Sequence, residues 1–332
     1  MGQTRTRGQS ARWVTALGLS LLSAGVAAAL GQQPAPPTAD QTVRVSTEVV
    51  NVYAIVKQKN RTVSDLKRED FELTEDNVPQ QLRYFSRETD TPLTLGILID
   101  TSPSQERVLP IEQVEAKNFL REVLRPKDLA FVLHFDFEVE LLRDLTNNLA
   151  LLSRAIDETV IRSAPSGPLP SPFPLPSVGG THLYDAVYLA SREMMKNEVG
   201  RKVLILLSDG EDQGSTVKLN TAVEAAHKAD VIVYSIAVID RAFYWGRMAG
   251  FSGDAVLRKL SEETGGRVIE VKRASDTGAA FREVAEELRT QYLLGYTPSN
   301  TKHDGSFRKI RVRVRNRDYK IQARRGYYAP SE

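Results

Sequence analysis

Two stretches of the chain, residues 93–99 and 202–208, are mostly apolar and do not alternate with polar positions. This pattern is typical of strands that are buried on both faces of a parallel sheet. Segments with a helical period alternate with further short apolar runs from there to residue 290. The pattern predicts an α/β domain, residues 91–290, with a doubly wound and mostly parallel sheet.

The two regions that flank this domain have a different period. Residues 43–57 and 308–317 alternate apolar and polar positions, as half-buried strands do. Other short segments of strand character, separated by turn residues, lie beside them without any helical period. We therefore predict a smaller all-β module in two pieces, residues 41–90 and 291–330. The pieces are expected to pack together, so that the α/β domain is an insertion in the module.

One helix and one loop of the α/β domain are well marked in the sequence. Residues 110–124 are expected to form a helix whose apolar side carries Ile111, Val114, Phe119 and Val123. Residues 164–178 are rich in proline, which fits neither a helix interior nor a central strand. They are therefore expected to form a loop.

Composition limits the classes of protein that the chain can belong to. The 332 residues are 41% hydrophobic and carry a formal net charge of +2, which is enough for one sizeable core and too balanced to indicate a polyanionic partner. Nucleic acid is therefore not expected as a partner. The chain contains no cysteine, so a disulfide framework and a thiolate metal site are both excluded.

The first 31 residues have the pattern of a signal peptide. Arg5, Arg7 and Arg12 precede an apolar stretch, and the small residues Ala27 and Ala29 offer a cleavage site. A linker, residues 32–40, follows. An uncleaved membrane anchor is the alternative, since the stretch is about long enough to span a bilayer. We predict an exported protein, periplasmic or extracellular, without a transmembrane helix after cleavage.

Oxygen-bearing side chains gather at the ends of the two buried strands. Asp100, Ser102 and Ser104 follow the first strand at every second position, and Asp209 follows the second. Thr181 comes after a pair of glycines at the expected start of a helix. Because ligands bind at the carboxyl ends of strands in an open parallel sheet, we expect these five side chains to converge. Oxygen ligands suit a hard cation such as Mg2+, Mn2+ or Ca2+. The alternative for Thr181 is an ordinary helix N-cap.

These residues and their spacing resemble the von Willebrand factor type A family. Its metal-ion-dependent adhesion site uses an Asp-x-Ser-x-Ser motif, a Thr and an Asp. The resemblance implies that the corresponding metal ligands here are Asp100, Ser102, Ser104, Thr181 and Asp209. It also implies binding of a protein ligand that offers an acidic side chain to the metal. The flanking KREDFELTEDN and LLGYTP segments resemble an exported group called VWFA-related acidobacterial proteins. Pro103 stands where many relatives have glycine, and it should stiffen the loop.

Two other functions compete with metal-dependent adhesion. A phosphatase of the haloacid dehalogenase type would need a second Asp at position 102, where a serine stands, and no G-x-S-x-G motif is present. We therefore predict that the protein is not an enzyme, with Mg2+-dependent phosphotransfer as the weaker alternative. Metal-independent contact with anionic glycans or lipid headgroups of the envelope is the other alternative, through Lys309, Arg311, Arg313 and Arg315 on one strand face. A solvent-facing strand has the same pattern.

Overall fold

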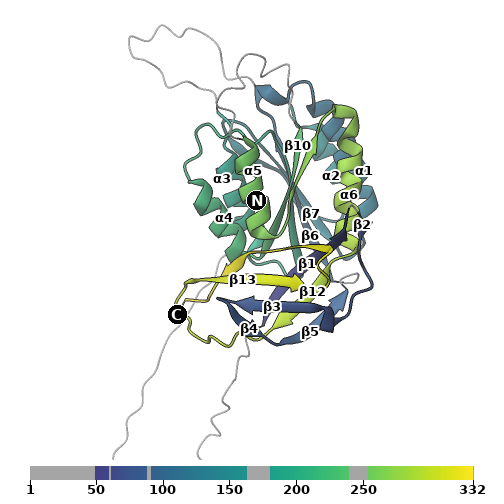
Figure 1. Ribbon diagram of the computed structural model, residues 1–332. Coiled ribbons are helices and arrows are strands. Elements are labelled where there is room, and N and C mark those ends of the chain that lie inside the picture. Colours follow the sequence, from purple (N-terminus) through teal and green to yellow (C-terminus); the bar gives the residue numbers. More distant parts are fainter. Residues whose placement is uncertain (1–48, 60, 88–90, 163–179, 239–252, 332) are drawn as a thin grey trace, which may run out of the picture. The chain divides into compact units, whose positions relative to one another are not determined.

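The computed structural model describes residues 49–331, except 60, 88–90, 163–179 and 239–252 (Figure 1). The predicted signal peptide, the predicted linker and the whole of the predicted proline-rich loop lie outside the described residues.

A six-stranded sheet forms the centre of the α/β part (Figure 1). In spatial order its strands are β11 (Val268–Val271), β10 (Val231–Val238), β9 (Arg201–Leu207), β6 (Leu93–Asp100), β7 (Leu129–Phe135) and β8 (Val139–Thr146). All neighbours are parallel except β8, which pairs antiparallel with β7 at the edge. Every residue of β6, β9 and β10 is buried, as their mostly apolar sequences indicate. The predicted fold class is confirmed.

Helices cover both faces of this sheet. One core cluster includes residues of α1 (Leu109–Val123), α2 (Leu149–Asp157) and α6 (Thr277–Arg289). The other includes α3 (Leu183–Leu189), α4 (Leu219–Lys228) and α5 (Gly253–Thr264), and α3 continues as one π-helical segment, Ala190–Met195. No helix within the described residues is long and apolar enough to cross a membrane.

The predicted apolar side of α1 is partly wrong. Val114 is 49% exposed, whereas Phe119 and Val123 are buried as expected. The buried stripe contains Leu109, Glu112, Ala116, Phe119, Leu120 and Val123. The spacing of three and four residues holds, but a carboxylate occupies one of its positions. The prediction considered only hydrophobic residues. It therefore assigned Val114 to the buried side of the helix and left out Glu112.

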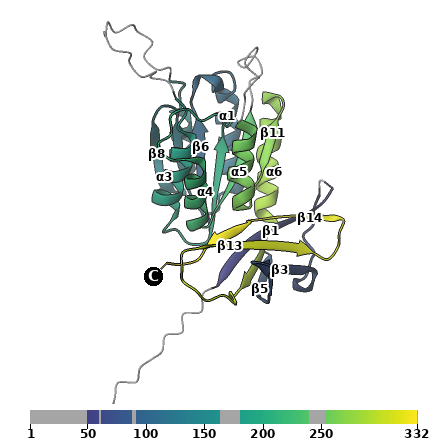
Figure 2. The ribbon, with the colours of Figure 1, turned by 60° about the vertical axis from the view of Figure 1, so that its left-hand side comes forward.

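Two antiparallel sheets form the all-β part (Figure 2). In the first, β1 (Val50–Gln58) lies between β12 (Tyr292–Tyr296) and β14 (Tyr319–Ala323), with β5 (Leu82–Arg87) beside β12 and β2 (Arg61–Thr62) beside β1. In the second, the order is β15 (Gly326–Tyr328), β13 (Phe307–Val314), β3 (Phe71–Glu75) and β4 (Val78–Gln80). Residues of both sheets share one hydrophobic core. Strands from the two ends of the described chain are thus hydrogen-bonded neighbours.

Ion pairs join the β strands to the helices of the α/β part. The Glu287 carboxylate of α6 lies 2.6 Å from Lys57 Nζ of β1 and 2.7 Å from Arg267 Nη2. Arg325, between β14 and β15, pairs with Glu262 and Glu263 of α5 at 2.7 and 3.0 Å. Charged side chains therefore contribute to the contact between the two parts.

Candidate metal-binding site

The candidate site lies at the switch point of the central sheet. Strands β6 and β9 are parallel neighbours. From β6 the chain continues through α1 to β7 on one side, and from β9 it continues through α4 to β10 on the other. Ligands of open α/β sheets bind where the strand order reverses in this way. Asp100 is the last residue of β6, and Asp209 follows β9 by two residues.

The first loop holds its three candidate ligands in a compact turn. The backbone N–H of Ser102 donates to Asp100 Oδ1 at 2.9 Å, and the hydroxyls of Ser102 and Ser104 lie 3.0 Å apart. Ser102 is extended, and Pro103 opens a short 3₁₀ turn, Pro103–Gln105, where its fixed φ is tolerated at the first position. All three candidate side chains are buried.

Two side chains connect this loop to the one that follows β9. The Ser208 hydroxyl donates to Asp100 Oδ2 at 2.6 Å. The Gln105 amide donates to Asp209 Oδ2 at 2.8 Å and to Ser104 Oγ at 3.3 Å. Four of the five predicted residues are therefore in one hydrogen-bonded group. Gln105 and Ser208 were missed as members of the site, although each is adjacent in sequence to a predicted ligand.

Thr181 is held beside these loops through its backbone. Its N–H and C=O exchange hydrogen bonds of 2.9 Å with Gln213, four residues after Asp209. The next N–H, of His182, donates to the carbonyl of Asp136 at 2.7 Å, directly after β7. A Cβ on Gly180 would lie 2.4 Å from the Gln213 carbonyl oxygen, so this close approach requires glycine.

The helix-cap alternative for Thr181 does not fit the geometry. The N-cap of α3 is His182, and it makes no side-chain cap bond. The N–H of Tyr184 in the first turn instead bonds to Asp212 Oδ1 and Ser215 Oγ, both at 3.1 Å. The hydroxyl of Thr181 is thus not needed to cap the helix.

A histidine also lies next to the first loop. His134 of β7 is buried, and its Nδ1 is 3.0 Å from the hydroxyl of Thr101, which follows Asp100. The same hydroxyl donates to Asp136 Oδ2 at 3.0 Å. This network fixes the residue after Asp100, and the sequence alone gave no spacing that would have placed His134 there.

Glu112 brings a third carboxylate to the site. It is fully buried in the first turn of α1, and neither carboxylate oxygen has a hydrogen-bond partner. Burial, followed by the charges of Asp100 and Asp209, raises the pKa of Glu112 to about 8. Burial and the charge of Asp209 likewise raise the pKa of Asp100 to about 7, against the hydrogen bonds from Ser102 and Ser208. The site therefore concentrates acidic groups away from water, where burial and their mutual repulsion favour the protonated forms of Glu112 and Asp100.

The buried polar atoms that lack a hydrogen-bond partner indicate whether a cation would suit this site. Three buried oxygens here lack a donor, namely Oε1 of Gln105 and both oxygens of Glu112, and all three are acceptors. A hydrated divalent cation supplies both positive charge and water O–H donors. No three His, Asp or Glu side chains of the described residues are grouped so that they could hold a metal ion by themselves. Hydroxyl ligands such as those of Ser102 and Ser104 would therefore have to contribute, as the motif implies.

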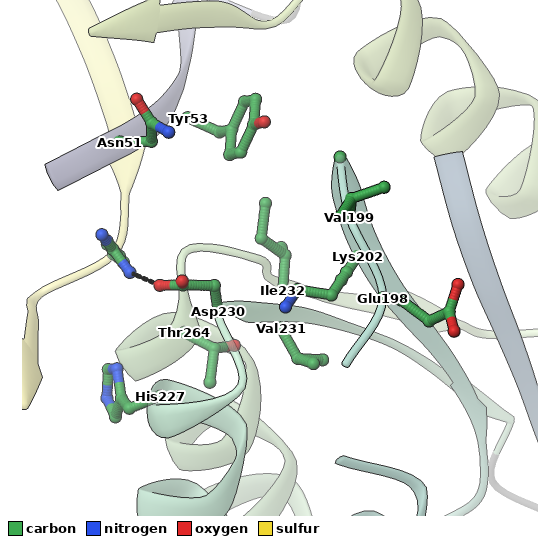
Figure 3. A pocket seen from close by; sticks show the side chains of 12 residues that line it. Asn51, Tyr53, Glu198, Val199, Lys202, His227, Asp230, Val231, Ile232 and Thr264 are labelled. Atoms are coloured by element: carbon green, nitrogen blue, oxygen red, sulfur yellow. Dashed lines mark hydrogen bonds and ion pairs between the residues drawn. The ribbon is translucent and has the colours of Figure 1, made fainter. Parts of the chain in front are cut away.

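A separate cavity lies at the opposite edge of the sheet, where β9 and β10 begin (Figure 3). It has a volume of about 240 Å3 and is lined by Asn51 and Tyr53 of β1 together with Lys202 and Asp230. Asp230 forms an ion pair there with Arg324. This cavity has no residue in common with the candidate site.

Comparisons with known proteins agree with this fold. Residues 174–284 match the family model of the von Willebrand factor type A domain, which confirms the resemblance for that part of the chain. A search of curated proteins found no match. The acidobacterial group is tested by neither comparison.

Three solved structures are reported as partly similar to this chain. Proximal thread matrix protein 1 from the mussel byssus is 15% identical, with a TM-score of 0.49 over 65% of this chain and 51% of that protein. This chain thus spans about half the length of that protein. A von Willebrand factor type A protein from Catenulispora acidiphila is 11% identical, with a TM-score of 0.49 over 86% and 75%. The von Willebrand factor domain of the type V pili tip protein Mfa5 from Porphyromonas gingivalis is 14% identical, with a TM-score of 0.43 over 59% and 94%.

Proposed function

We propose that the chain, whose residues 174–284 match the von Willebrand factor type A domain, binds a divalent cation and, through that ion, a protein ligand. The proposed metal ligands are Asp100, Ser102, Ser104, Thr181 and Asp209. The proposed ion is Mg2+, with Mn2+ and Ca2+ as further candidates. The proposed activity is adhesion, with no chemical reaction.

One observation carries this proposal. The loops after β6 and β9, more than 100 residues apart in sequence, are joined by Ser208 to Asp100 and by Gln105 to Asp209. These bonds bring two buried carboxylates and two buried serine hydroxyls together. Burying carboxylates costs free energy unless opposite charges or hydrogen bonds compensate for the lost hydration. A cluster of buried acids and hydroxyls is therefore not explained by packing of the core.

The ligand chemistry favours binding of an acidic partner. Mg2+ takes six ligands and usually keeps several water molecules that can exchange. A carboxylate from a partner protein can replace one of these waters. A bond of this kind lasts only while the ion is present, so removal of the ion should release the partner.

The test is loss of cation binding in Asp100→Ala. Calorimetric titration with MgCl2 should show binding to the wild-type chain and none to the variant, because a central carboxylate is missing. Asp144→Ala, which changes an exposed aspartate on β8, should bind as the wild type does. Circular dichroism should show that both variants are folded. Unchanged Mg2+ affinity in Asp100→Ala would refute the site.

We also propose that the protein is exported and that residues 41–90 and 291–330 form one β module. The basic residues and apolar stretch of residues 1–31 support export. The antiparallel pairing of β1 with β12 and β14 supports the division into domains. Cleavage near Ala29, detected by mass spectrometry of secreted protein, would test the first proposal.

The exposed basic face of β13 supports a second candidate function. Lys309, Arg311 and Arg313 are exposed, while Ile310 and Val312 are buried between them. A row of cations on a strand attracts anionic glycans or lipid headgroups, and salt screens that attraction. Binding to anionic vesicles that survives EDTA and is lost in high salt would support this function. Binding that depends on Mg2+ would support the metal site instead.

A further inference from the structure

Glu112 is unusual among the buried acids of this protein. Seven acidic side chains of the described residues are buried, and Glu112 is the one whose two oxygens both lack a hydrogen-bond partner. It lies on the buried stripe of α1 between Leu109 and Ala116, where an apolar residue would be expected. An isolated carboxylate in such a place costs stability.

The surroundings of Glu112 indicate what compensates this cost. The charges of Asp100 and Asp209 contribute to the raised pKa of Glu112, so these two proposed ligands lie within electrostatic range of its carboxylate. The amide of Gln105, bonded to Asp209 and Ser104, also has an unpartnered buried oxygen. Gln105, which is bonded to two proposed ligands, and Glu112, which is within electrostatic range of two, thus carry three buried acceptors without donors.

Direct coordination by Glu112 is not the arrangement that the geometry favours. The described residues contain no group of three His, Asp or Glu side chains able to hold a metal ion. Water molecules bound to a divalent cation, by contrast, point their hydrogens outward and need acceptors. The unpartnered oxygens of Glu112 and Gln105 are acceptors of that kind.

We propose that Glu112 is an outer carboxylate of the cation site, which accepts hydrogen bonds from water bound to the ion and helps to retain it by its charge. This inference rests on the proposed function. It adds to the five motif residues a residue of α1 that the motif does not contain. Because Glu112 acts through water, it leaves the position for a partner's carboxylate free.

The experiment compares Glu112→Gln with Glu122→Gln in the full chain. Both variants replace a glutamate of α1 by its amide, but Glu122 is exposed. Calorimetric titration with MgCl2 and MnCl2 should give an affinity at least tenfold lower for Glu112→Gln and an unchanged affinity for Glu122→Gln. The melting temperature in EDTA at pH 8 should be higher for Glu112→Gln than for the wild type, because the amide removes a buried charge.

These two readouts separate the proposed role from a structural one. A residue needed only for packing would lower the melting temperature when it is changed, and that result would overturn the inference. Wild-type affinity in Glu112→Gln, or in Glu112→Ala if the amide variant does not fold, would overturn it as well. A wild-type chain that binds neither ion contradicts the proposed function itself. Loss of binding in Asp100→Ala with full binding in Glu112→Gln contradicts the inference alone.

Discussion

Buried carboxylates in two regions of this protein are treated in opposite ways. In the β sheets and at their junction with α6, the chain supplies donors: Glu75 accepts from the hydroxyls of Tyr296 and Tyr327, at 2.7 and 3.0 Å, and Glu287 pairs with Lys57 and Arg267. At the carboxyl edge of the central sheet, Glu112 receives no donor.

The difference indicates which acids are structural. A carboxylate with donors from its own chain is compensated as soon as the protein folds. A carboxylate without them, or one such as Asp100 whose donors are outweighed by burial and by a second carboxylate, is compensated only by something that the chain does not contain, such as a proton or a cation. Stability should therefore depend on pH and on divalent cations at the sheet edge, and it should not depend on divalent cations at the junction with the β strands.

The largest expected effect concerns pH in the absence of divalent cations. The pKa of Glu112 is raised from 4.5 to about 8 and that of Asp100 from 3.8 to about 7, so the folded chain holds more protons than the unfolded chain between about pH 4 and pH 8. The free energy of unfolding should therefore fall as pH rises through this range. The slope is about 1.4 kcal/mol per pH unit for each extra proton held.

Urea unfolding in EDTA at pH 5 and pH 8 measures this slope. Glu112→Gln should reduce it, and saturating Mg2+ should oppose the loss at pH 8, because the ion replaces the proton. A free energy of unfolding that rises from pH 5 to pH 8 in EDTA would contradict the comparison.

A smaller effect is expected at the junction. Glu287→Ala leaves Lys57 and Arg267 without their buried partner and should lower the free energy of unfolding by about 3 kcal/mol. The loss should be the same with Mg2+ and with EDTA, as measured by urea unfolding. The exposed neighbour serves as the control, since Glu286→Ala should change stability by less than about 0.5 kcal/mol.

The smallest of the three effects concerns Asp128. Its two oxygens accept the backbone N–H groups of Leu93 and Arg125, at 2.9 and 3.0 Å, where β6 begins. Asp128→Ala removes both acceptors and should cost about 2 kcal/mol. Mg2+ affinity measured by calorimetry should not change, because Asp128 lies at the opposite end of β6 from Asp100. A loss of Mg2+ binding would show that the two ends of the strand are not independent.

The parts of the fold that could be predicted are those in which burial alone determines the sequence pattern of apolar residues. Strands β6 and β9 are buried along their whole length, so unbroken apolar runs marked them. Asp100 and Asp209 followed from the position of those runs, because a parallel sheet fixes which ends of its strands lie together. Thr181 was expected at the same edge because it lies at the start of a helix, but the backbone bonds to Gln213 that hold it there could not be predicted from the sequence.

Residues that act through tertiary contacts could not be found in this way. Gln105 matters because its amide reaches Asp209, 104 positions later in the sequence, and no local period predicts that contact. Glu112 carried one usable signal, its position on a stripe spaced three and four residues apart. A prediction that assigns the buried face of a helix from apolar residues alone does not use the position of Glu112.

The pairing of β5 with β12 has a mechanical consequence. Arg87, where the chain leaves toward the α/β part, is the direct partner of Tyr292, where it returns. Tension applied to the two ends of the chain therefore acts first on β1, β5, β12 and their neighbours. The backbone hydrogen bonds between these strands must break before the tension reaches β6 or β9. The β strands therefore shield the α/β part, with its proposed cation site, from a pull on the two ends of the chain.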